Sequence, residues 1–216
     1  MSDDLEMTVE SARFKFSRAV REYKKVHRVY IDYAQTLPQY LLDNCRVFSD
    51  RLQMLSSGIF PVDGVWAEVG VDLALFSREI IEKTKPLKIH LLDIDIARID
   101  MANISNAVSN GTAIIHEGDS STILRSFDDE YFDVVYVDGD HYYEGVKKDI
   151  DAARHKIKSG GYMVFNDYTS WSPGSMSKCG VAKAANEFVL EEKWNVVAIA
   201  LQGSGYYDLA IQKPYL

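Results

Sequence analysis

The chain has 216 residues, of which 47 % are hydrophobic and 26 % are charged. This length and composition suit one folded domain with an extension. The formal net charge of −8 argues against a nucleic-acid-binding protein, which normally presents a basic face. No segment approaches the run of about 18 apolar residues that a membrane-spanning helix needs. We therefore expect a soluble protein that binds neither nucleic acid nor a membrane.

The two cysteines, Cys45 and Cys179, have neither the spacing of a metal site nor that of a redox motif. Two cysteines cannot build a disulfide framework, and free thiols are typical of a reducing compartment. The sequence thus predicts a cytoplasmic location.

The first 59 residues carry two predicted helices, one over residues 10–34 and one over residues 41–55. In each of them, apolar side chains recur at steps of four and three residues, which is typical of an amphipathic helix. We expect residues 1–59 to form a helical extension. It could pack on the sheet edge, cover the active site as a substrate lid, or contact another subunit in a homo-oligomer.

From Val65 onward, predicted strands alternate with predicted helices, which is typical of a parallel sheet. The chain then ends in a predicted hairpin around Gln202-Gly-Ser-Gly205. The predicted fold class is α/β, a Rossmann-like doubly wound sheet over residues 60–216. It has seven strands and is mostly parallel, with an antiparallel C-terminal hairpin strand, and the N-terminal helices precede it. The expected strands are residues 65–69, 88–94, 113–116, 132–137, 162–165, 195–201 and 206–212, and the expected helices are residues 73–83, 97–109, 121–127, 146–157 and 181–191.

Two of these strands are apolar runs that stop abruptly at polar residues. The run before Asp138 is followed by Asp140 and His141, and the run ending at Phe165 is followed by Asn166 and Asp167. Unbroken apolar strands belong in a parallel sheet that helices cover on both faces. Ligands bind beyond the carboxyl ends of such strands. We therefore expect these side chains to gather at one rim and to carry the chemistry.

Three earlier turns predict a nucleoside site on the same rim. Gly70 ends the first strand of the sheet, Asp93 follows it by 23 residues at the end of the next strand, and Gly118-Asp119-Ser120 follows the third. A glycine at a strand end allows close approach of a ligand, and an acid at this distance binds ribose hydroxyls in dinucleotide folds. The further glycines of a dinucleotide or phosphate-binding loop are missing. The expected ligand is therefore a nucleoside without a pyrophosphate.

These motifs together resemble the class I S-adenosylmethionine-dependent methyltransferases. Glu68-x-Gly70-x-x-x-Ala74 looks like their first motif, Asp93 like their ribose acid, and the turn at Gly118 like their adenine-side turn. Where the family has its last glycine this chain has Ala74, which bears on cofactor affinity. The resemblance implies S-adenosyl-L-methionine as cofactor and a set of residues that bind it. They are Glu68, Gly70, Asp72, Ser77, Asp93, Asp119, Ser120 and Asp138.

Within this class, two segments look most like the macrocin/mycinamicin O-methyltransferases and the "methyltransferase 24" type. They are Asp138-Gly-Asp-His141 and the stretch from Gly160 to Tyr168. The resemblance implies methyl transfer to a hydroxyl of a small polar acceptor, a sugar or a glycosylated natural product. Tyr142, Tyr143, Tyr168 and Trp171 would then border the acceptor.

Methyl transfer to a hydroxyl needs an acceptor oxygen that is positioned and made nucleophilic by a base or by Mg²⁺. We expect His141 to be the base, with Asp138 beside it as the second catalytic residue, since an unperturbed histidine titrates near neutrality. The expected magnesium ligands are Asp138, Asp167 and Asn166, although Asn166 would point to the other side if its strand continues. His141 could instead be a structural tie that holds Asp138.

Two alternatives remain open at this stage. One keeps the cofactor but methylates nitrogen or carbon without a metal. The other is a cofactor-binding but inactive partner protein, for which Ala74 is the support. The sequence does not identify the acceptor.

Overall fold

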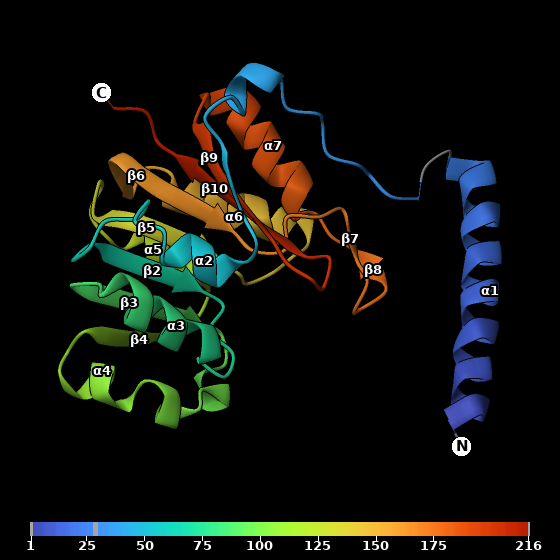
Figure 1. The fold of residues 1–216 in the computed structure, drawn as a ribbon, viewed down its shortest axis with the longest axis horizontal. Coiled ribbons are helices and arrows are strands. Elements are labelled where there is room, and N and C mark those ends of the chain that lie inside the picture. The colour runs from blue at the N-terminus through green and yellow to red at the C-terminus, as the bar shows by residue number, and fades with distance from the viewer. Residues whose placement is uncertain (1, 28–29, 216) are drawn as a thin grey trace. The chain divides into compact units, whose positions relative to one another are not determined.

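The computed structural model describes residues 2–27 and 30–215 (Figure 1). The chain divides into two compact units, Met1–Asp32 and Tyr33–Leu216. The boundary thus lies earlier than residue 59, where the sequence placed the end of the extension.

The first unit contains helix α1, Ser2–His27. The helix expected over residues 10–34 thus begins earlier and ends earlier than predicted. Tyr30 lies outside the helix, and its ring packs back against the rings of Phe16 and Tyr23. Residues 28 and 29 lie outside the described part of the chain.

The prediction of one helix over residues 41–55 is wrong. A 3₁₀ turn, η1 (Gln39–Leu41), is followed by a strand, β1 (Arg46–Phe48), and a short helix, α2 (Arg51–Leu55). Asp50 starts α2, since its carboxylate accepts a hydrogen bond of 2.8 Å from the backbone N–H of Gln53. The apolar residues of this segment serve two different elements. Met54 and Leu55 of α2 pack into the core, while β1 pairs at the edge of the sheet.

The main sheet is α/β in class and mostly parallel, as predicted, but it has eight strands because β1 is added. The strand order is β1-β9-β10-β6-β5-β2-β3-β4. β10 runs antiparallel to both of its neighbours, which confirms the reversed hairpin strand. The strands after β1 are β2 (Val65–Val69), β3 (Lys88–Asp93), β4 (Ala113–Glu117), β5 (Phe132–Val137), β6 (Ile157–Phe165), β9 (Asn195–Leu201) and β10 (Tyr207–Gln212). A separate small hairpin pairs β7 (Trp171–Ser172) with β8 (Ser177–Lys178).

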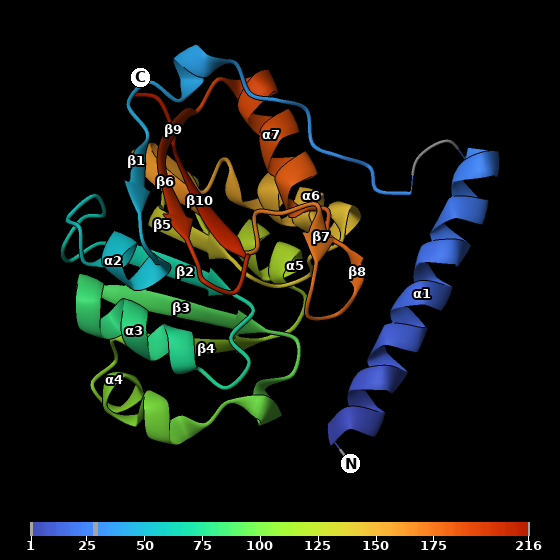
Figure 2. The ribbon, with the colours of Figure 1, turned by 45° about the vertical axis from the view of Figure 1, so that its right-hand side comes forward.

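Helices cover both faces of this sheet, so its central strands are buried (Figure 2). One core lies under α5 (Ser120–Arg125), α6 (Tyr143–Ala153) and α7 (Val181–Glu192). The other lies under α2, α3 (Leu75–Thr84) and α4 (Ser105–Ser109). This arrangement is the physical reason why the strands read as unbroken apolar runs.

The helix expected over residues 97–109 is broken into three pieces. Two 3₁₀ turns, η2 (Ile96–Arg98) and η3 (Met101–Asn103), precede α4. The side chains of Asp95 and Asp100 each accept a backbone N–H two residues ahead, so each starts a new turn. Among the described residues, no helix is both long and apolar enough to cross a membrane.

Candidate active site

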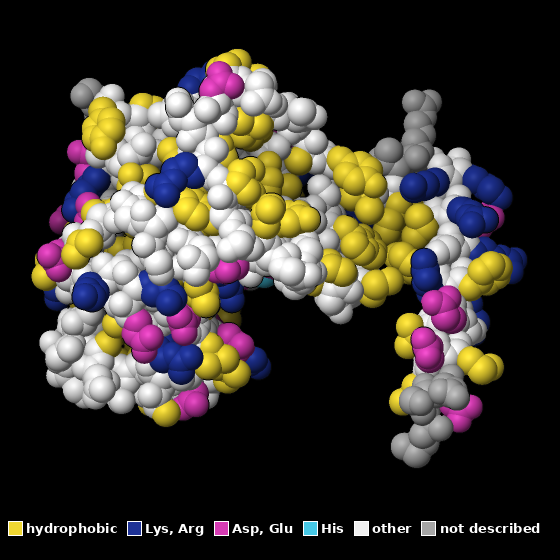
Figure 3. Space-filling model, in the orientation of Figure 1, with side chains coloured by type: hydrophobic (Ala, Val, Ile, Leu, Met, Phe, Trp, Pro, Cys, Tyr) yellow, Lys and Arg dark blue, Asp and Glu magenta, His cyan; other side chains and the backbone are white. Residues whose placement is uncertain are grey.

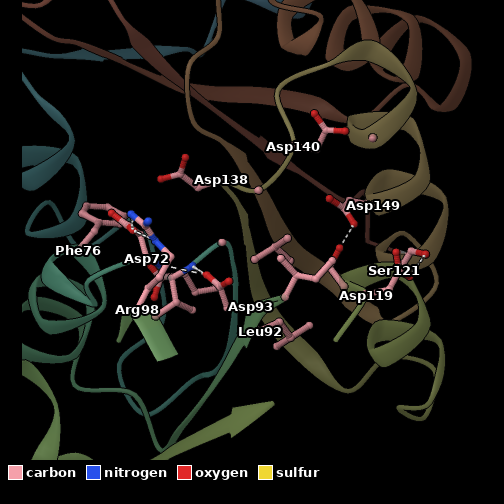
Figure 4. Close-up of a pocket in the computed structure, with 18 of the residues that line it drawn as sticks. Asp72, Phe76, Leu92, Asp93, Arg98, Asp119, Ser121, Asp138, Asp140 and Asp149 are labelled. Atoms are coloured by element: carbon pink, nitrogen blue, oxygen red, sulfur yellow. Dashed lines mark hydrogen bonds and ion pairs between the residues drawn. The ribbon is translucent and has the colours of Figure 1, made fainter. Parts of the chain in front are cut away.

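A cavity of about 760 Å³ opens at the carboxyl ends of β2, β3, β4 and β5. This volume is within the range of small-molecule sites. Most of the residues predicted to bind the cofactor line it, and Figure 4 shows acidic side chains around its wall. They are Glu68, Gly70, Asp72, Asp93, Asp119, Ser120 and Asp138.

Gly70 fixes the geometry of the loop after β2. Its φ is +84°, and a Cβ atom at this position would lie 2.1 Å from the backbone oxygen of Asp138. Only glycine therefore allows the end of β2 to lie this close to the end of β5. Ala74, at the start of α3, also adopts a left-handed conformation, with φ +57°. Alanine is disfavoured there by about 1–2 kcal/mol, which explains why a glycine suits this position.

Asp93 organises the same loop through its carboxylate. Oδ2 accepts the backbone N–H of Val71 at 2.7 Å and that of Asp72 at 3.0 Å, and Oδ1 accepts the N–H of Asp95 at 2.9 Å. Partial burial raises the pKa of Asp93, but these N–H groups outweigh it and leave the pKa below its ordinary value. The carboxylate is thus charged, and it faces the cavity.

The opposite wall of the cavity is built by the start of α5 and by α6. The Asp119 carboxylate caps α5, with hydrogen bonds of 2.8 Å from the Thr122 backbone and 2.7 Å from the Ser121 hydroxyl. These bonds lower the pKa of Asp119 to about 2. Ser120 donates to Asp149 at 2.5 Å, and burial raises the pKa of Asp149 to about 6. Figure 4 shows Asp119 and Asp149 on the side of the cavity away from Asp72 and Arg98.

Glu68 lies at the floor of the cavity and is almost fully buried. Burial raises its pKa to about 8, and the Ser77 hydroxyl, which donates to it at 2.5 Å, only partly offsets this. Ser77 itself does not line the cavity, so its predicted contact with the cofactor is not supported. Its hydroxyl is directed to Glu68 because it lies on the buried face of α3.

Arginines at the cavity wall were missed by the sequence reasoning. Arg98 forms an ion pair with Asp72, with 2.6 Å between Nε and Oδ1. Arg51 lies over the Phe76 ring, 4.0 Å from its centroid, and its Nη1 is 4.0 Å from Oδ2 of Asp138. The sequence did not predict Arg51 as a site residue, because the segment around it was expected to be one amphipathic helix.

The predicted catalytic residues meet at the rim beside this cavity. His141 Nε2 lies 3.2 Å from Oδ1 of Asp138, and His141 Nδ1 lies 3.9 Å from Oδ2 of Asp167. The hydrogen bond with Asp138 raises the pKa of His141, against the effect of its own partial burial. Burial raises the pKa of Asp138 and that of Asp167, while His141 opposes both shifts. The structure thus forms a carboxylate–histidine pair, with a second carboxylate on the other side of the ring.

The prediction that Asn166 is a metal ligand is wrong. Its amide points away from the rim and donates to Oδ1 of Asp208 at 3.2 Å. Side chains alternate along the end of β6, and the chain then turns at Asp167, whose φ is +52°. Two carboxylates and His141 remain at the rim. Among the described residues, no group of three or more His, Cys, Asp or Glu side chains is arranged to hold a metal ion. The structure therefore gives no support to the expected Mg²⁺ site.

Asn166 belongs instead to a buried polar cluster under the rim. Asp208 accepts hydrogen bonds from the Tyr136 hydroxyl at 2.6 Å and from the Gln202 amide at 2.8 Å. Burial raises the pKa of Asp208 to about 7, although the hydrogen bonds from Tyr136 and Asn166 lower it. The sequence gave no hint of this cluster, because Tyr136 and Asp208 each lie within an apolar strand.

The aromatic residues expected around the acceptor differ in their surroundings. Tyr143 and Tyr168 use their hydroxyls in hydrogen bonds with α7, to Glu187 at 2.5 Å and to Asn186 at 2.7 Å. Tyr142 is mostly exposed. Two of these four residues therefore have structural partners that the sequence did not reveal.

The cavity and rim can now be compared with known proteins. Residues 67–168 match the family described as "Methyltransferase domain" (Methyltransf_24), and this stretch runs from β2 to just beyond β6. A curated relative, the uncharacterized protein R132 of Acanthamoeba polyphaga mimivirus, is 41 % identical over 46 residues. That match covers 20 % of this chain and 21 % of the viral protein, so the chain spans about a fifth of this relative.

Solved structures share the fold over about three quarters of the chain. An O-methyltransferase family protein from Burkholderia thailandensis has a TM-score of 0.59 and 16 % identity, over 76 % of this chain and 55 % of that one. The N-methyltransferase NodS from Bradyrhizobium japonicum WM9, in complex with S-adenosyl-l-homocysteine, has a TM-score of 0.58 and 18 % identity, over 76 % and 84 %. These similarities show the fold, and these two proteins are named for different acceptor atoms, oxygen and nitrogen.

Proposed function

Because residues 67–168 match a methyltransferase domain, we propose that this chain transfers a methyl group from S-adenosylmethionine to a hydroxyl of a small polar acceptor. The observation that carries this proposal is the Asp138–His141 pair at the rim of the cavity. In this proposal, His141 is a base beside the Asp138 end of the ligand cavity.

The cavity fits the cofactor in shape and in charge. Gly70 lines the cavity at the end of β2, and the Asp93 carboxylate offers a charged acceptor for ribose hydroxyls. When bound, S-adenosylmethionine supplies an electrophilic methyl group on a positively charged sulfur. Asp138 is the acid that lines the cavity and also contacts His141, so it connects cofactor and base.

The hydrogen bond to Asp138 decides which nitrogen of His141 can act. An ionised carboxylate only accepts hydrogen bonds, so Nε2 carries the proton and Nδ1 keeps its lone pair. Nδ1 is too far from Asp167, at 3.9 Å, for a hydrogen bond. An acceptor hydroxyl between them can donate its proton to Nδ1. His141 would thereby make the oxygen nucleophilic toward the methyl group that the bound cofactor would supply, with the cofactor sulfur as the leaving group.

We infer that this reaction needs no metal, because the carboxylates that could bind one are directed to His141. Asp138 contacts it directly, and Asp167 faces its other nitrogen. The resemblance to macrocin and mycinamicin O-methyltransferases suggests a sugar or a glycosylated natural product as acceptor. Methylation of nitrogen or carbon is the alternative chemistry at the same rim.

The cofactor part of the proposal is tested by calorimetry with S-adenosylhomocysteine. Asp93→Asn should weaken binding by about 1.5–3 kcal/mol, the usual value of hydrogen bonds to a charged group. Asp95→Asn is the matched control, since Asp95 is close by but does not line the cavity. Equal affinity of the Asp93 variant and the wild type would refute this cofactor site.

The catalytic part is tested by turnover with a panel of hydroxyl and amine acceptors. His141→Ala should lower kcat by about 10²–10⁴, the usual contribution of a general base, and leave cofactor affinity unchanged. If this variant loses thermal stability but keeps its turnover, His141 is a structural tie. If the wild type turns over no acceptor but still binds cofactor, the chain is an inactive binding partner.

A further inference from the structure

Helix α1 carries an apolar seam that the proposed reaction does not use. From Leu5 to Val26, every residue reached by alternating steps of four and three is apolar. The members of this seam are Leu5, Val9, Ala12, Phe16, Ala19, Tyr23 and Val26. Their mean spacing is that of a heptad, the repeat by which one helix packs along another.

Both ends of the seam are open. Leu5 is 66 % exposed and Val9 65 % exposed at one end, and Val26 is 76 % exposed at the other. In the middle, Tyr30 packs edge-on against Phe16 and Tyr23, with ring centroids 5.9 and 5.5 Å apart. Helix packing along the whole seam therefore needs the Tyr30 ring to move aside.

The charges of α1 change sign along its length. Its acidic residues lie mainly in the first nine positions, and its basic residues lie beyond them, as Figure 3 shows for this helix. The acids of the first part are Asp3, Asp4, Glu6 and Glu10, and the bases of the second part are Arg13, Lys15, Arg18, Arg21, Lys24 and Lys25. Two such helices repel when parallel and attract when antiparallel.

From the seam and these charges, we propose that α1 pairs antiparallel with α1 of a second copy of this chain. In the antiparallel register that pairs the seam from Val9 to Val26, these two residues face each other, and Leu5 extends beyond the paired part. Each aromatic ring then meets a small residue, since Phe16 faces Ala19 and Tyr23 faces Ala12. Beside the seam, Lys15 lies next to Glu22 of the other copy. A parallel pair would instead place ring against ring and acid against acid.

The oligomeric state of the full chain tests this pairing, measured by light scattering after gel filtration. The wild type should be a dimer, and the double variant Val9→Glu/Val26→Glu should be a monomer, with association weakened more than about 100-fold, because unpaired charges would be buried in the seam. Met7→Glu/Phe14→Glu is the matched control. Met7 and Phe14 are 71 % and 72 % exposed, and they lie on the opposite side of the helix from the seam. This control should remain a dimer.

The orientation is tested by disulfide formation between Val9→Cys and Val26→Cys proteins. An antiparallel pair predicts a disulfide only when the two proteins are mixed, whereas a parallel pair predicts that each protein links to itself. The wild type under the same oxidant accounts for Cys45 and Cys179. A monomeric wild type, a control that dissociates like the seam variant, or self-linked single variants would each overturn the proposal.

Discussion

Asp138 should set the proton affinity of His141, and Asp138→Asn tests this directly. Asparagine keeps the shape of the side chain but removes its charge. In the structure, the hydrogen bond from Nε2 to Asp138 is the largest cause of the raised pKa of His141. The charged form of the ring is therefore favoured by this carboxylate, and its loss should lower the pKa.

The size of the effect follows from the 3.2 Å separation and from the exposure of the ring, which is 36 %. Two unit charges at this distance attract each other by about 1.3 kcal/mol at a dielectric constant of about 80, that of water. The attraction is about 2.6 kcal/mol if the effective dielectric constant is about 40. Solvent screening at this exposure favours the lower part of that range. Loss of this attraction should therefore lower the pKa of His141 in the variant.

The measurement is an NMR titration of the histidine rings, which needs no acceptor. The chain has five histidines, and His141→Gln identifies the signal. The wild-type ring should titrate above its ordinary value, and the Asp138→Asn ring clearly lower. Turnover should rise with pH through the same pKa, because the base must be neutral. An unshifted His141 pKa in the variant would refute the pair as the source of the base.

Three further results are expected. Turnover should be unchanged by EDTA, because Asp138 and Asp167 both face His141, and loss of activity that Mg²⁺ restores would refute this. The protein should become less stable to heat as pH rises from about 5 to about 8, because the folded-state pKa values of Glu68 and Asp208 lie at about 8 and about 7, above the ordinary values near 4 of the unfolded chain, and stability falls across the interval between the two. Glu68→Gln should make the melting temperature depend less on pH. An equally steep dependence in that variant would show that other groups cause it. The wild type should bind S-adenosylmethionine more tightly than S-adenosylhomocysteine, because the acidic cavity favours the sulfonium charge, and calorimetry should show this preference reduced by Asp138→Asn and by added salt.

The sequence predicted the sheet well because its strands are buried on both faces. Their apolar runs and the turn residues between them are local signals, so β2 to β5 and the C-terminal hairpin were placed correctly, whereas β6 begins at Ile157, five residues before the predicted start. β1 was missed because an edge strand of three residues has no such signal. It is stabilised by pairing with β9, about 150 residues later, and local spacing carries no information on that contact.

The same distinction holds for the site. Asp93 and Asp138 were found because they follow strands, and the strand ends of a parallel sheet meet at one edge. Arg51 and Asp208 were missed because their positions depend on tertiary contacts, with Phe76 and with Tyr136 respectively. For Ser77 and Asn166, the sequence predicted the right helix and strand but not the direction in which the side chain points. The burial of one face of α3 and the alternation along β6 turn them away from the cavity and the rim.

The cofactor loop and the catalytic pair are connected by one backbone contact. The N–H of Asp138 donates to the carbonyl of Val69 at 2.8 Å, and the following residue, Gly70, lies directly against the carbonyl of Asp138. The loop that is proposed to bind the cofactor and the carboxylate that contacts His141 are therefore coupled in position. A position so crowded accepts no side chain, which explains the glycine without reference to any ligand. The same packing places the proposed base, His141, beside the cavity, so the contact between two strand ends determines both halves of the proposed site.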